Sequence, residues 1–317
     1  MQQATDCLVI GAGITGLSCA AALHAAGREV LIIDKGRGIG GRMATRRVSL
    51  DAGEISFDHG AQYLRSDTPR FHAALAQAGA QNWPDDGNSA RLVGVPGMSS
   101  LPRRMSEGLL IMQSVEVTAL GRSDPGWRVQ STGGDITARQ VVLTIPAPQA
   151  RALLTTEGAL AAPLSKVQMA PCLTLMAAFP LNSARPFLQD HAPDAELSWI
   201  AQDSSKPGRP EGAVTWVAQA GSDFSRAHLE QTPERLAEMM LPLLAARIGV
   251  DPATALYASV HRWRYAQTVT PLGLPFLNLP DRSLYLGGDW CLGARADHGF
   301  ASGLAIAEDM LGHAHVA

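Results

Sequence analysis

Cysteine is scarce in this chain of 317 residues, with only four, at positions 7, 19, 172 and 291. No two of them form a Cys-x-x-Cys pair, which is the spacing typical of zinc sites and of dithiol redox sites. The spacing does not favour either kind of site, and we expect no metal. Cys7 and Cys19 fall in apolar segments, where a free thiol packs as a small hydrophobic residue.

Long apolar runs and an excess of charge are absent as well. No run approaches the ~20 apolar residues needed to span a bilayer, and the first one, Cys7–Ile10, is too short for a signal peptide. The 26 basic and 29 acidic residues leave a net charge of −3, so we expect neither nucleic acid nor a membrane as a partner. We expect a cytoplasmic protein, long enough for two domains.

Lysine is nearly absent, with Lys35, Lys166 and Lys206 as its only occurrences. Arginine therefore carries most of the positive charge, and its planar guanidinium suits two-point contacts with phosphate. Aromatic residues make up only 5% of the chain, so the sequence shows no evident aromatic cage for a ligand.

The first 34 residues nevertheless contain a strong pattern. An apolar strand, Cys7–Ile10, leads into the glycine-rich turn Gly11–Gly16 and an alanine-rich helix, Leu17–Ala26. A second apolar strand, Val30–Ile33, ends at Asp34. A strand, a G-x-G-x-x-G turn, a helix and an acidic residue about 20 positions later form the dinucleotide-binding βαβ unit.

The chemistry of a dinucleotide explains these residues. Gly11 permits a tight turn, Gly13 lets the backbone approach a pyrophosphate, and Gly16 allows helix and strand to pack closely. The helix N-terminus attracts the phosphates, and Asp34 suits the ribose hydroxyls. The candidate cofactor contacts in this unit are Gly11, Ala12, Gly13, Ile14, Thr15, Gly16, Asp34 and Lys35.

A second glycine pair, Gly40-Gly41, follows with Arg42 directly after it. We expect Gly41 and Arg42 to meet the same pyrophosphate from another side; the alternative is a flexible glycine loop. Arg46 and Arg47 are expected to be solvated. The acidic strand end followed by GGR resembles the extended fingerprint of FAD enzymes in the amine oxidase and renalase group.

Three further segments resemble that group, and the resemblance implies their roles. Gly60, Ala61 and Gln62, in "SFDHGAQYL", would pass the flavin ring, with His59 as a further candidate contact. Val115, or else Val117, would meet the adenine through its backbone. In "GGDWCLGARADHGFASG", Asp289 would bind the ribityl or phosphate region. A helix starting at Gly299-Phe300-Ala301 would direct backbone N–H groups at the flavin.

The resemblance implies an α/β fold: a Rossmann-like FAD-binding domain of the two-dinucleotide-binding type, with a smaller α+β substrate domain. We assign residues 1–75, 101–150 and 256–317 to the first, and 76–100 and 151–255 to the second. Composition predicts an exposed loop at Ser204–Gly212 and a long helix over Thr232–Val250.

"SVHRWRYAQ" (Ser259–Gln267) has the alternation of a strand. His261, Trp263 and Tyr265 would share one face, while Arg262 and Arg264 would share the other. A half-buried strand with a solvated arginine face is one interpretation. The other is that the aromatic face lines the substrate pocket, where it could stack on a flat ring together with Gln62.

The motifs GGRMxxRR, AQY, VGxPGM, HRWxYA and GDWC are most similar to bacterial renalase-like proteins. The resemblance implies an FAD-dependent oxidase of the 2- and 6-dihydro isomers of NAD(P), with O2 as acceptor and H2O2 as product. Restoring the aromatic ring needs no general base, and the sequence shows no convincing acid–base constellation. We therefore assign no catalytic residue, only the positioning candidates His261, Trp263, Tyr265 and Gln62.

Two alternatives stay open: another FAD-dependent amine oxidase or desaturase, and a non-catalytic FAD-binding scaffold. Amine oxidases use a lysine near the flavin, yet Lys35 is committed to the ribose end and Lys206 lies in a polar loop; Lys166 has no evident place. Cys291 does not stand in the context of a flavin-attachment cysteine. We therefore expect FAD to bind noncovalently.

Overall fold

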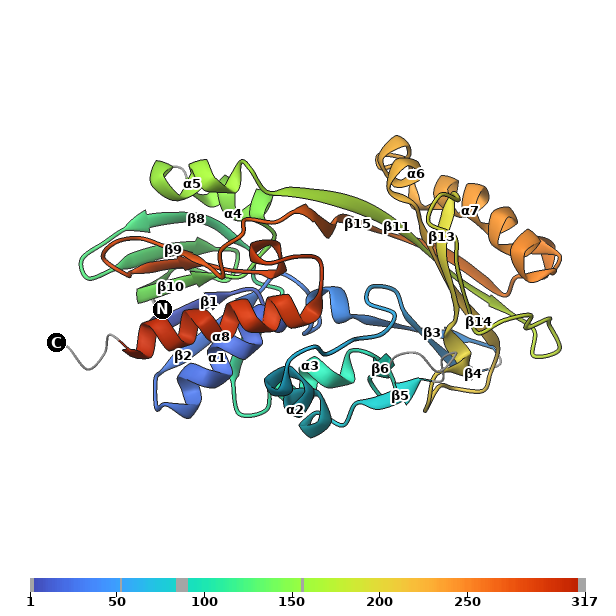
Figure 1. Ribbon diagram of the computed structural model, residues 1–317, viewed down its shortest axis with the longest axis horizontal. Coiled ribbons are helices and arrows are strands. Elements are labelled where there is room, and N and C mark those ends of the chain that lie inside the picture. The colour runs from blue at the N-terminus through green and yellow to red at the C-terminus, as the bar shows by residue number, and fades with distance from the viewer. Residues whose placement is uncertain (1–2, 52, 84–90, 155–156, 313–317) are drawn as a thin grey trace.

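The computed structural model describes residues 3–51, 53–83, 91–154 and 157–312. Figure 1 shows an elongated molecule with a large sheet at one end and a second sheet at the other. Among the described residues, no helix is long and apolar enough to cross a membrane.

The larger sheet has the order β16-β17-β10-β1-β2-β7, with β8 and β9 attached beside β10. Its strands are β1 (Gln3–Ile10), β2 (Val30–Asp34), β7 (Leu110–Gln113), β8 (Val117–Arg122), β9 (Trp127–Ser131), β10 (Ile136–Leu143), β16 (Leu277–Asn278) and β17 (Leu284–Leu286). The five strands from β17 to β7 run parallel. Parallel strands bring their carboxyl ends to one edge, which is where such sheets bind ligands. The predicted Rossmann-like domain is confirmed.

Helices α1 (Ile14–Ala25) and α8 (Ala296–Gly312) lie against each other beside this sheet (Figure 1). Their backbones approach closely at Gly303, where an added Cβ would lie 2.2 Å from the Thr15 carbonyl oxygen. The shorter helices are α2 (Pro69–Gln77), α3 (Ser100–Met105), α4 (Ala147–Leu153) and α5 (Gly158–Leu164).

The second sheet is antiparallel, with the order β12-β13-β14-β11-β15. Its strands are β11 (Gln168–Phe179), β12 (Gln189–His191), β13 (Leu197–Gln202), β14 (Val214–Ala220) and β15 (Tyr257–Thr270). One face packs on α7 (Pro233–Ile248), whose neighbour is α6 (Ser222–Ala227). Thr232 caps α7 by accepting a hydrogen bond from the Arg235 N–H, and Gly249 ends it in the left-handed conformation, so the predicted helix forms.

Two sequence expectations differ from this architecture. Strand β15 pairs along β11 in the second sheet, although we placed residues 256–317 with the FAD domain. The segment Ser204–Gly212 is not an exposed loop, because Lys206 is only 2% exposed and Arg209 only 8%. Its polar composition reflects buried ion pairs, which composition alone cannot distinguish from solvated charge.

Two further pairs of antiparallel strands form small sheets of their own: β3 (Thr45–Leu50) with β4 (Gly53–Asp58), and β5 (Gln81–Trp83) with β6 (Arg91–Val93). Ile55 and Phe57 of β4 pack against Met176 and Val217 in the second sheet. The chain after β4 therefore runs between the two sheets.

The close crossing of α1 and α8 predicts a stability effect. In Gly303→Ala, the new Cβ would overlap the Thr15 carbonyl oxygen and the Ser18 hydroxyl, so the helices must separate. We expect a loss of about 1–3 kcal/mol in the free energy of unfolding, typical of overpacking. Gly312→Ala in the same helix is the control, because its Cβ would meet nothing within 4 Å. Equal denaturation midpoints for the two variants would contradict this account.

Candidate functional site

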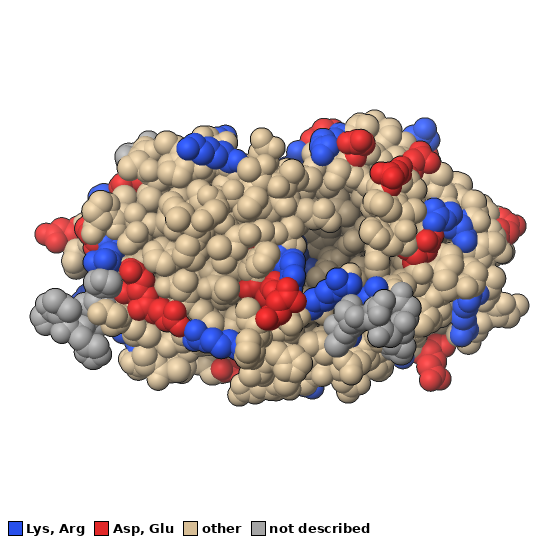
Figure 2. Space-filling view, in the orientation of Figure 1, with Lys and Arg blue, Asp and Glu red and all other residues tan. Residues whose placement is uncertain are grey.

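A cavity of about 1800 Å³ opens at the carboxyl ends of the parallel strands and extends under the second sheet. Figure 2 shows a hollow near the middle of the molecule, with basic side chains beside it. The volume exceeds the ~300–1,000 Å³ of ordinary ligand pockets. It therefore has room for a dinucleotide cofactor together with a second molecule.

The first glycine cluster shapes one wall. An added Cβ at Gly16 would lie 1.9 Å from the Gly11 carbonyl oxygen, so only glycine permits this contact between strand end and helix. At Gly13 a Cβ would meet nothing within 4 Å, which leaves open space in front of the helix N-terminus. This is the cradle that a pyrophosphate fills in dinucleotide-binding folds.

The second glycine cluster lies beside the first. The Gly40 N–H donates to the Ala12 carbonyl at 2.9 Å, and a Cβ at Gly41 would lie 3.7 Å from the Gly13 Cα. Gly41 also has a positive φ of 54°, a conformation in which glycine is favoured. Both clusters thus border the same space.

Asp34 and its neighbours line the far end of this wall. The Asp34 carboxylate accepts the N–H groups of Ala12 and Gly36, both at 2.6 Å, and the Val115 N–H donates to the Asp34 carbonyl at 2.9 Å. Lys35 pairs with Glu116 at 3.6 Å. Val115 therefore has its carbonyl, and not its N–H, left to offer an adenine.

Arg42 and Asp289 meet each other in the cavity wall. Two guanidinium nitrogens contact the two carboxylate oxygens at 2.7 and 2.6 Å, and Arg42 also donates to the Ala266 carbonyl at 2.8 Å. We expected Arg42 at the pyrophosphate and Asp289 at the ribityl or phosphate region of the cofactor. Their bidentate pairing links the second glycine cluster to the chain after β17.

The segment His59–Gln62 crosses the cavity between the sheets. Its carbonyl groups accept hydrogen bonds from side chains: Trp263 Nε1 binds His59 O at 2.7 Å, and Gln219 Nε2 binds Gly60 O at 2.7 Å. The Ala61 N–H donates to Arg42 O at 2.8 Å. The Gln62 amide nitrogen donates to the Asp58 and Gly60 carbonyls, so it holds this segment in place and is not directed at a substrate.

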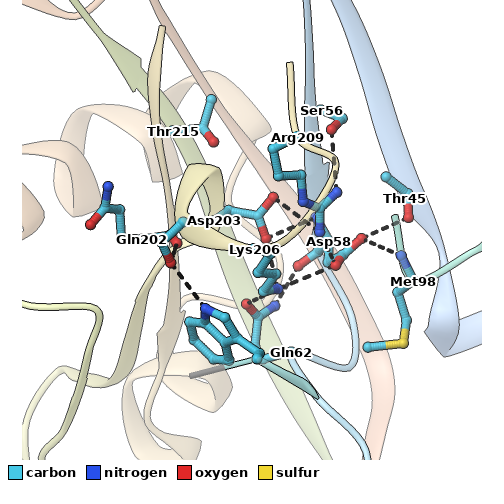
Figure 3. A network of polar contacts seen from close by, with 12 residues as sticks. Thr45, Ser56, Asp58, Gln62, Met98, Gln202, Asp203, Lys206, Arg209 and Thr215 are labelled. Carbon is cyan, nitrogen blue, oxygen red and sulfur yellow. Dashed lines mark hydrogen bonds and ion pairs between the residues drawn. The ribbon is translucent and has the colours of Figure 1, made fainter. Parts of the chain in front are cut away.

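A buried ion-pair network lies directly behind this segment (Figure 3). Lys206 Nζ contacts Asp203 at 2.7 Å, Asp58 at 3.2 Å and the Gln62 amide oxygen at 3.4 Å. Arg209 pairs with the same two carboxylates. All four charged side chains are at most 2% exposed, and none of them lines the cavity.

The Lys206 ammonium is the shared partner of this network. Lys206→Met would leave Asp58 and Asp203 with one cation between them, and uncompensated buried charge costs about 3–5 kcal/mol. We expect a fall of that size in the free energy of unfolding, measured by urea denaturation. The exposed Lys166→Met is the matched control and should change it little. A variant as stable as the control would show that the network does not stabilise the fold.

His59, His261 and Trp263 form a compact ring cluster in the cavity wall. His59 stacks on Trp263 with centroids 5.4 Å apart, and His261 meets the two rings edge-on at 4.7 and 4.3 Å. Tyr265 lines the cavity further along β15. Arg262 and Arg264 pair with Glu230, although both also border the cavity, so the separation of an aromatic face from a solvated arginine face stays a prediction.

Both histidines are neutral at physiological pH. Burial lowers the pKa of His59 to about 4, and the nearby charge of Arg46 acts in the same direction. Burial also lowers the pKa of His261 to about 4, assisted by His59 and Arg46. The cluster therefore exposes uncharged rings to the cavity, beside the half-buried guanidinium of Arg46.

These lowered pKa values predict how stability depends on pH. Between pH 6.5 and 4 the unfolded chain binds protons on these histidines while the folded chain does not, so the free energy of unfolding falls as the pH decreases. His261→Gln removes one such group and should weaken this dependence, measured from melting temperatures across the window. The exposed His72→Gln should keep the wild-type slope. Parallel curves for all three proteins would refute the assignment.

The C-terminal helix starts earlier than predicted. It begins at Ala296, and the Gly299 N–H already donates to the Arg295 carbonyl at 3.2 Å. Phe300 is buried against Phe71, with ring centroids 5.1 Å apart. Gly299, Phe300 and Ala301 are thus inside the helix and outside the cavity lining, so the predicted role of their N–H groups is wrong. Asp297 lies in the first turn, where acidic residues are favoured, and could have indicated the earlier helix start.

All four cysteines are free and buried. Burial raises the pKa of the Cys291 thiol to about 12, and Cys291 does not line the cavity. These properties fit the expectation of a noncovalent flavin. Within the described ranges, no three His, Cys, Asp or Glu side chains are grouped as metal ligands.

Arginine dominates the charged lining of the cavity. Nine arginines and one lysine face three carboxylates, in a protein whose acidic residues outnumber its basic ones by 29 to 26. Each carboxylate already has a partner: Asp34 binds backbone N–H groups, Glu116 binds Lys35 and Asp289 binds Arg42. Four of the arginines are also paired with carboxylates, namely Arg42, Arg262, Arg264 and Arg295. Sequence reasoning treated Arg46 as solvated, because nothing in the sequence places β3 beside the histidines.

Aromatic residues also gather here, despite their rarity. Tyr63, Trp199, Trp263 and Tyr265 line the cavity, although no single motif contains them all. The low aromatic content therefore did not show that the cavity lacks aromatic walls. Of these residues, Trp199 was missed, because its short strand carries no distinguishing motif.

Comparison with known proteins agrees with this geometry. Residues 9–78 match the NAD(P)-binding Rossmann-like domain family, and residues 81–311 match the flavin containing amine oxidoreductase family. The two matches together include nearly all of the cavity wall. The glycine cradle and the volume of the cavity fit FAD, the cofactor expected from the sequence.

Solved structures show the same fold at low identity. A putrescine oxidase bound to putrescine is 12% identical with a TM-score of 0.72, covering 98% of this chain and 100% of that one. A protein assigned as a protoporphyrinogen oxidase, from Exiguobacterium sp. 255-15, is 14% identical with a TM-score of 0.73, covering 98% and 99%. Cyclohexylamine oxidase from Brevibacterium oxydans IH-35A is 15% identical with a TM-score of 0.71, covering 97% and 99%.

Proposed function

The chain belongs to the flavin containing amine oxidoreductase family and uses FAD as its cofactor, and from this premise we propose that it oxidises the 2- and 6-dihydro isomers of NAD(P)H. In the proposed reaction, the dihydronicotinamide, O2 and a proton give NAD(P)+ and H2O2. When bound, FAD supplies the two-electron chemistry by accepting a hydride and passing the electrons to O2. The protein's part is to bind, orient and select.

The cationic lining of the cavity is the observation that carries this proposal. A dinucleotide substrate brings a pyrophosphate, which guanidinium groups bind well. An amine substrate brings an ammonium, and the three carboxylates of the lining are already partnered. Four of the nine lining arginines are paired as well, which leaves five without a carboxylate partner among the described residues. Repulsion therefore favours the anionic substrate over the cationic one.

The uncharged ring cluster supports the same reading. A dihydronicotinamide regains an aromatic ring when it loses hydride, so no residue needs to remove a proton. The lowered pKa values of His59 and His261 keep both rings neutral, and their place beside Trp263 makes a surface for a flat ring. We assign positioning, and not acid–base catalysis, to His261, Trp263 and Tyr265.

The cofactor would be held by the two glycine clusters together with the Arg42–Asp289 pair. Gly13 and Gly41 leave open space for a pyrophosphate. Asp34 lies at the position from which an acidic residue binds the ribose hydroxyls in this fold. The segment His59–Gln62 would border the flavin ring, which is why its firm attachment to Trp263 and Gln219 matters.

An amine oxidase is the second candidate, because putrescine oxidase and cyclohexylamine oxidase share the fold. The lysines of this chain do not favour it. Lys206 is sealed in the ion-pair network away from the cavity, Lys166 is exposed, and Lys35 pairs with Glu116. None of these three lysines therefore lies at the ring cluster of His59, His261 and Trp263, where an amine oxidase lysine would be needed.

The decisive measurement is anaerobic stopped-flow mixing of the FAD-bound enzyme with separated 2-, 4- and 6-dihydro NAD isomers. We expect rapid bleaching of the flavin by the 2- or the 6-isomer. Ordinary NADH, the 4-isomer, is the matched control with the same charge and size, and should bleach it far more slowly. The product NAD+ and one equivalent of H2O2 per turnover in air would complete the assignment.

The same experiment separates the alternatives. Bleaching by putrescine or cyclohexylamine, with none by any dihydronicotinamide, would replace this proposal with an amine oxidase. Bleaching by no donor would point to an FAD-binding scaffold.

A further inference from the structure

One row of side chains crosses the entire second sheet on the face that borders the cavity. Thr174 is paired with His261 on one side and Gln219 on the other; Gln219 is paired with Trp199, and Trp199 with His191. Directly paired residues share a face of the sheet. All of them except the buried Thr174 line the cavity.

The row has aromatic groups at both ends. Four strand spacings of ~4.8 Å place its ends roughly 19 Å apart. His261 and Trp263 occupy one end, and Trp199 with His191 occupies the other. A dinucleotide has the same plan, with a flat ring at each end and a charged link between them.

The far end carries cationic groups as well as aromatic rings. The ring centroids of Tyr63 and Trp199 lie 5.6 Å apart, and the Arg65 guanidinium lies 5.5 Å from the centre of the Tyr63 ring. Arg91 lies over both rings, at 4.8 and 5.7 Å. Arg65 is exposed, and within the described residues it forms no ion pair with a carboxylate at hydrogen-bond distance. Arg65 therefore combines an accessible charge with an aromatic platform.

We propose that Tyr63, Trp199 and Arg65 form the subsite for the adenosine half of the dinucleotide substrate. This inference rests on the proposed function and deepens it. The adenine stacks on the aromatic pair, Arg65 binds the phosphates, and the nicotinamide lies at the His261–Trp263 end. The cavity could then hold the entire substrate beside the cofactor.

The adenosine half takes no part in hydride transfer, so this subsite contributes the same binding energy before and during the reaction. Such uniform binding lowers KM and leaves kcat unchanged. Removing it should therefore raise KM for a substrate that carries the adenosine half, and for no other.

The test compares the 2- or 6-dihydro isomer of NAD with the matching dihydronicotinamide mononucleotide, which lacks the adenylate. We expect Arg65→Gln and Trp199→Leu each to raise KM for the dinucleotide about tenfold, as the loss of a stacking or phosphate contact does. KM for the mononucleotide and kcat for both should stay as in the wild type. Arg185→Gln is the control, since Arg185 is exposed and outside the cavity lining. Trp199→Phe should restore most of the affinity.

A second readout does not depend on turnover. ADP-ribose carries the adenosine and the pyrophosphate without a nicotinamide, so it should bind the FAD-bound enzyme in a calorimeter. Arg65→Gln should weaken this binding about tenfold, and Arg185→Gln should not. Because Arg65 is exposed, its replacement leaves the fold intact.

The two proposals fail in different ways. If the wild type oxidises the dinucleotide and the mononucleotide with equal KM, or if Arg65→Gln leaves ADP-ribose binding unchanged, the subsite is wrong and the proposed function stands. If no isomer reduces the flavin, the proposed function is wrong. In that case, ADP-ribose binding that depends on Arg65 would still support the subsite.

Discussion

The Asp58 carboxylate is the constraint on which the two halves of this protein depend. It is fully buried, and such a charge is tolerated only when charged and hydrogen-bonding partners surround it. Those partners come from several parts of the chain: Thr45 and the Met98 N–H on one side, Lys206 and Arg209 on the other. Satisfying one carboxylate therefore fixes the position of β4 relative to the second sheet. The segment His59–Gln62 follows β4 directly, so its position at the border of the cavity is fixed as well.

A second constraint acts at the opposite wall, where backbone must approach backbone. Gly16 permits the strand end and helix to touch, and the Gly40 N–H ties the second glycine cluster to the first. The open side of both clusters faces the cavity, where Arg42 and Asp289 neutralise each other. Two kinds of interaction thus build the site. Glycines let the backbone come close to the cofactor, and the buried charges around Asp58 hold the segment His59–Gln62 in place.

Local patterns were enough to predict much of this arrangement. The βαβ unit, the strand over Ser259–Gln267 and the helix over Thr232–Val250 each depend on residues near one another in sequence, and each forms. The errors share a cause, which is that burial depends on distant partners. The charges of Ser204–Gly212 resemble those of a solvated loop until Asp58 is placed beside them, 145 or more residues away. The start of α8 was misjudged because glycine at 299 was taken as a boundary, whereas close packing against α1 requires small residues inside the helix.

The charge of the cavity is the physical basis of the proposed substrate. Arginines outnumber carboxylates in the lining, and every lining carboxylate is already partnered. Burial keeps His59 and His261 neutral, so the ring cluster adds no charge of its own. Under the proposed function, selection would depend on where an anion can lie relative to those rings, and a substrate with a flat ring at a fixed distance from its phosphates would meet both conditions. Because the proposed substrate gains aromaticity when it is oxidised, placing it correctly would be most of what the protein has to do.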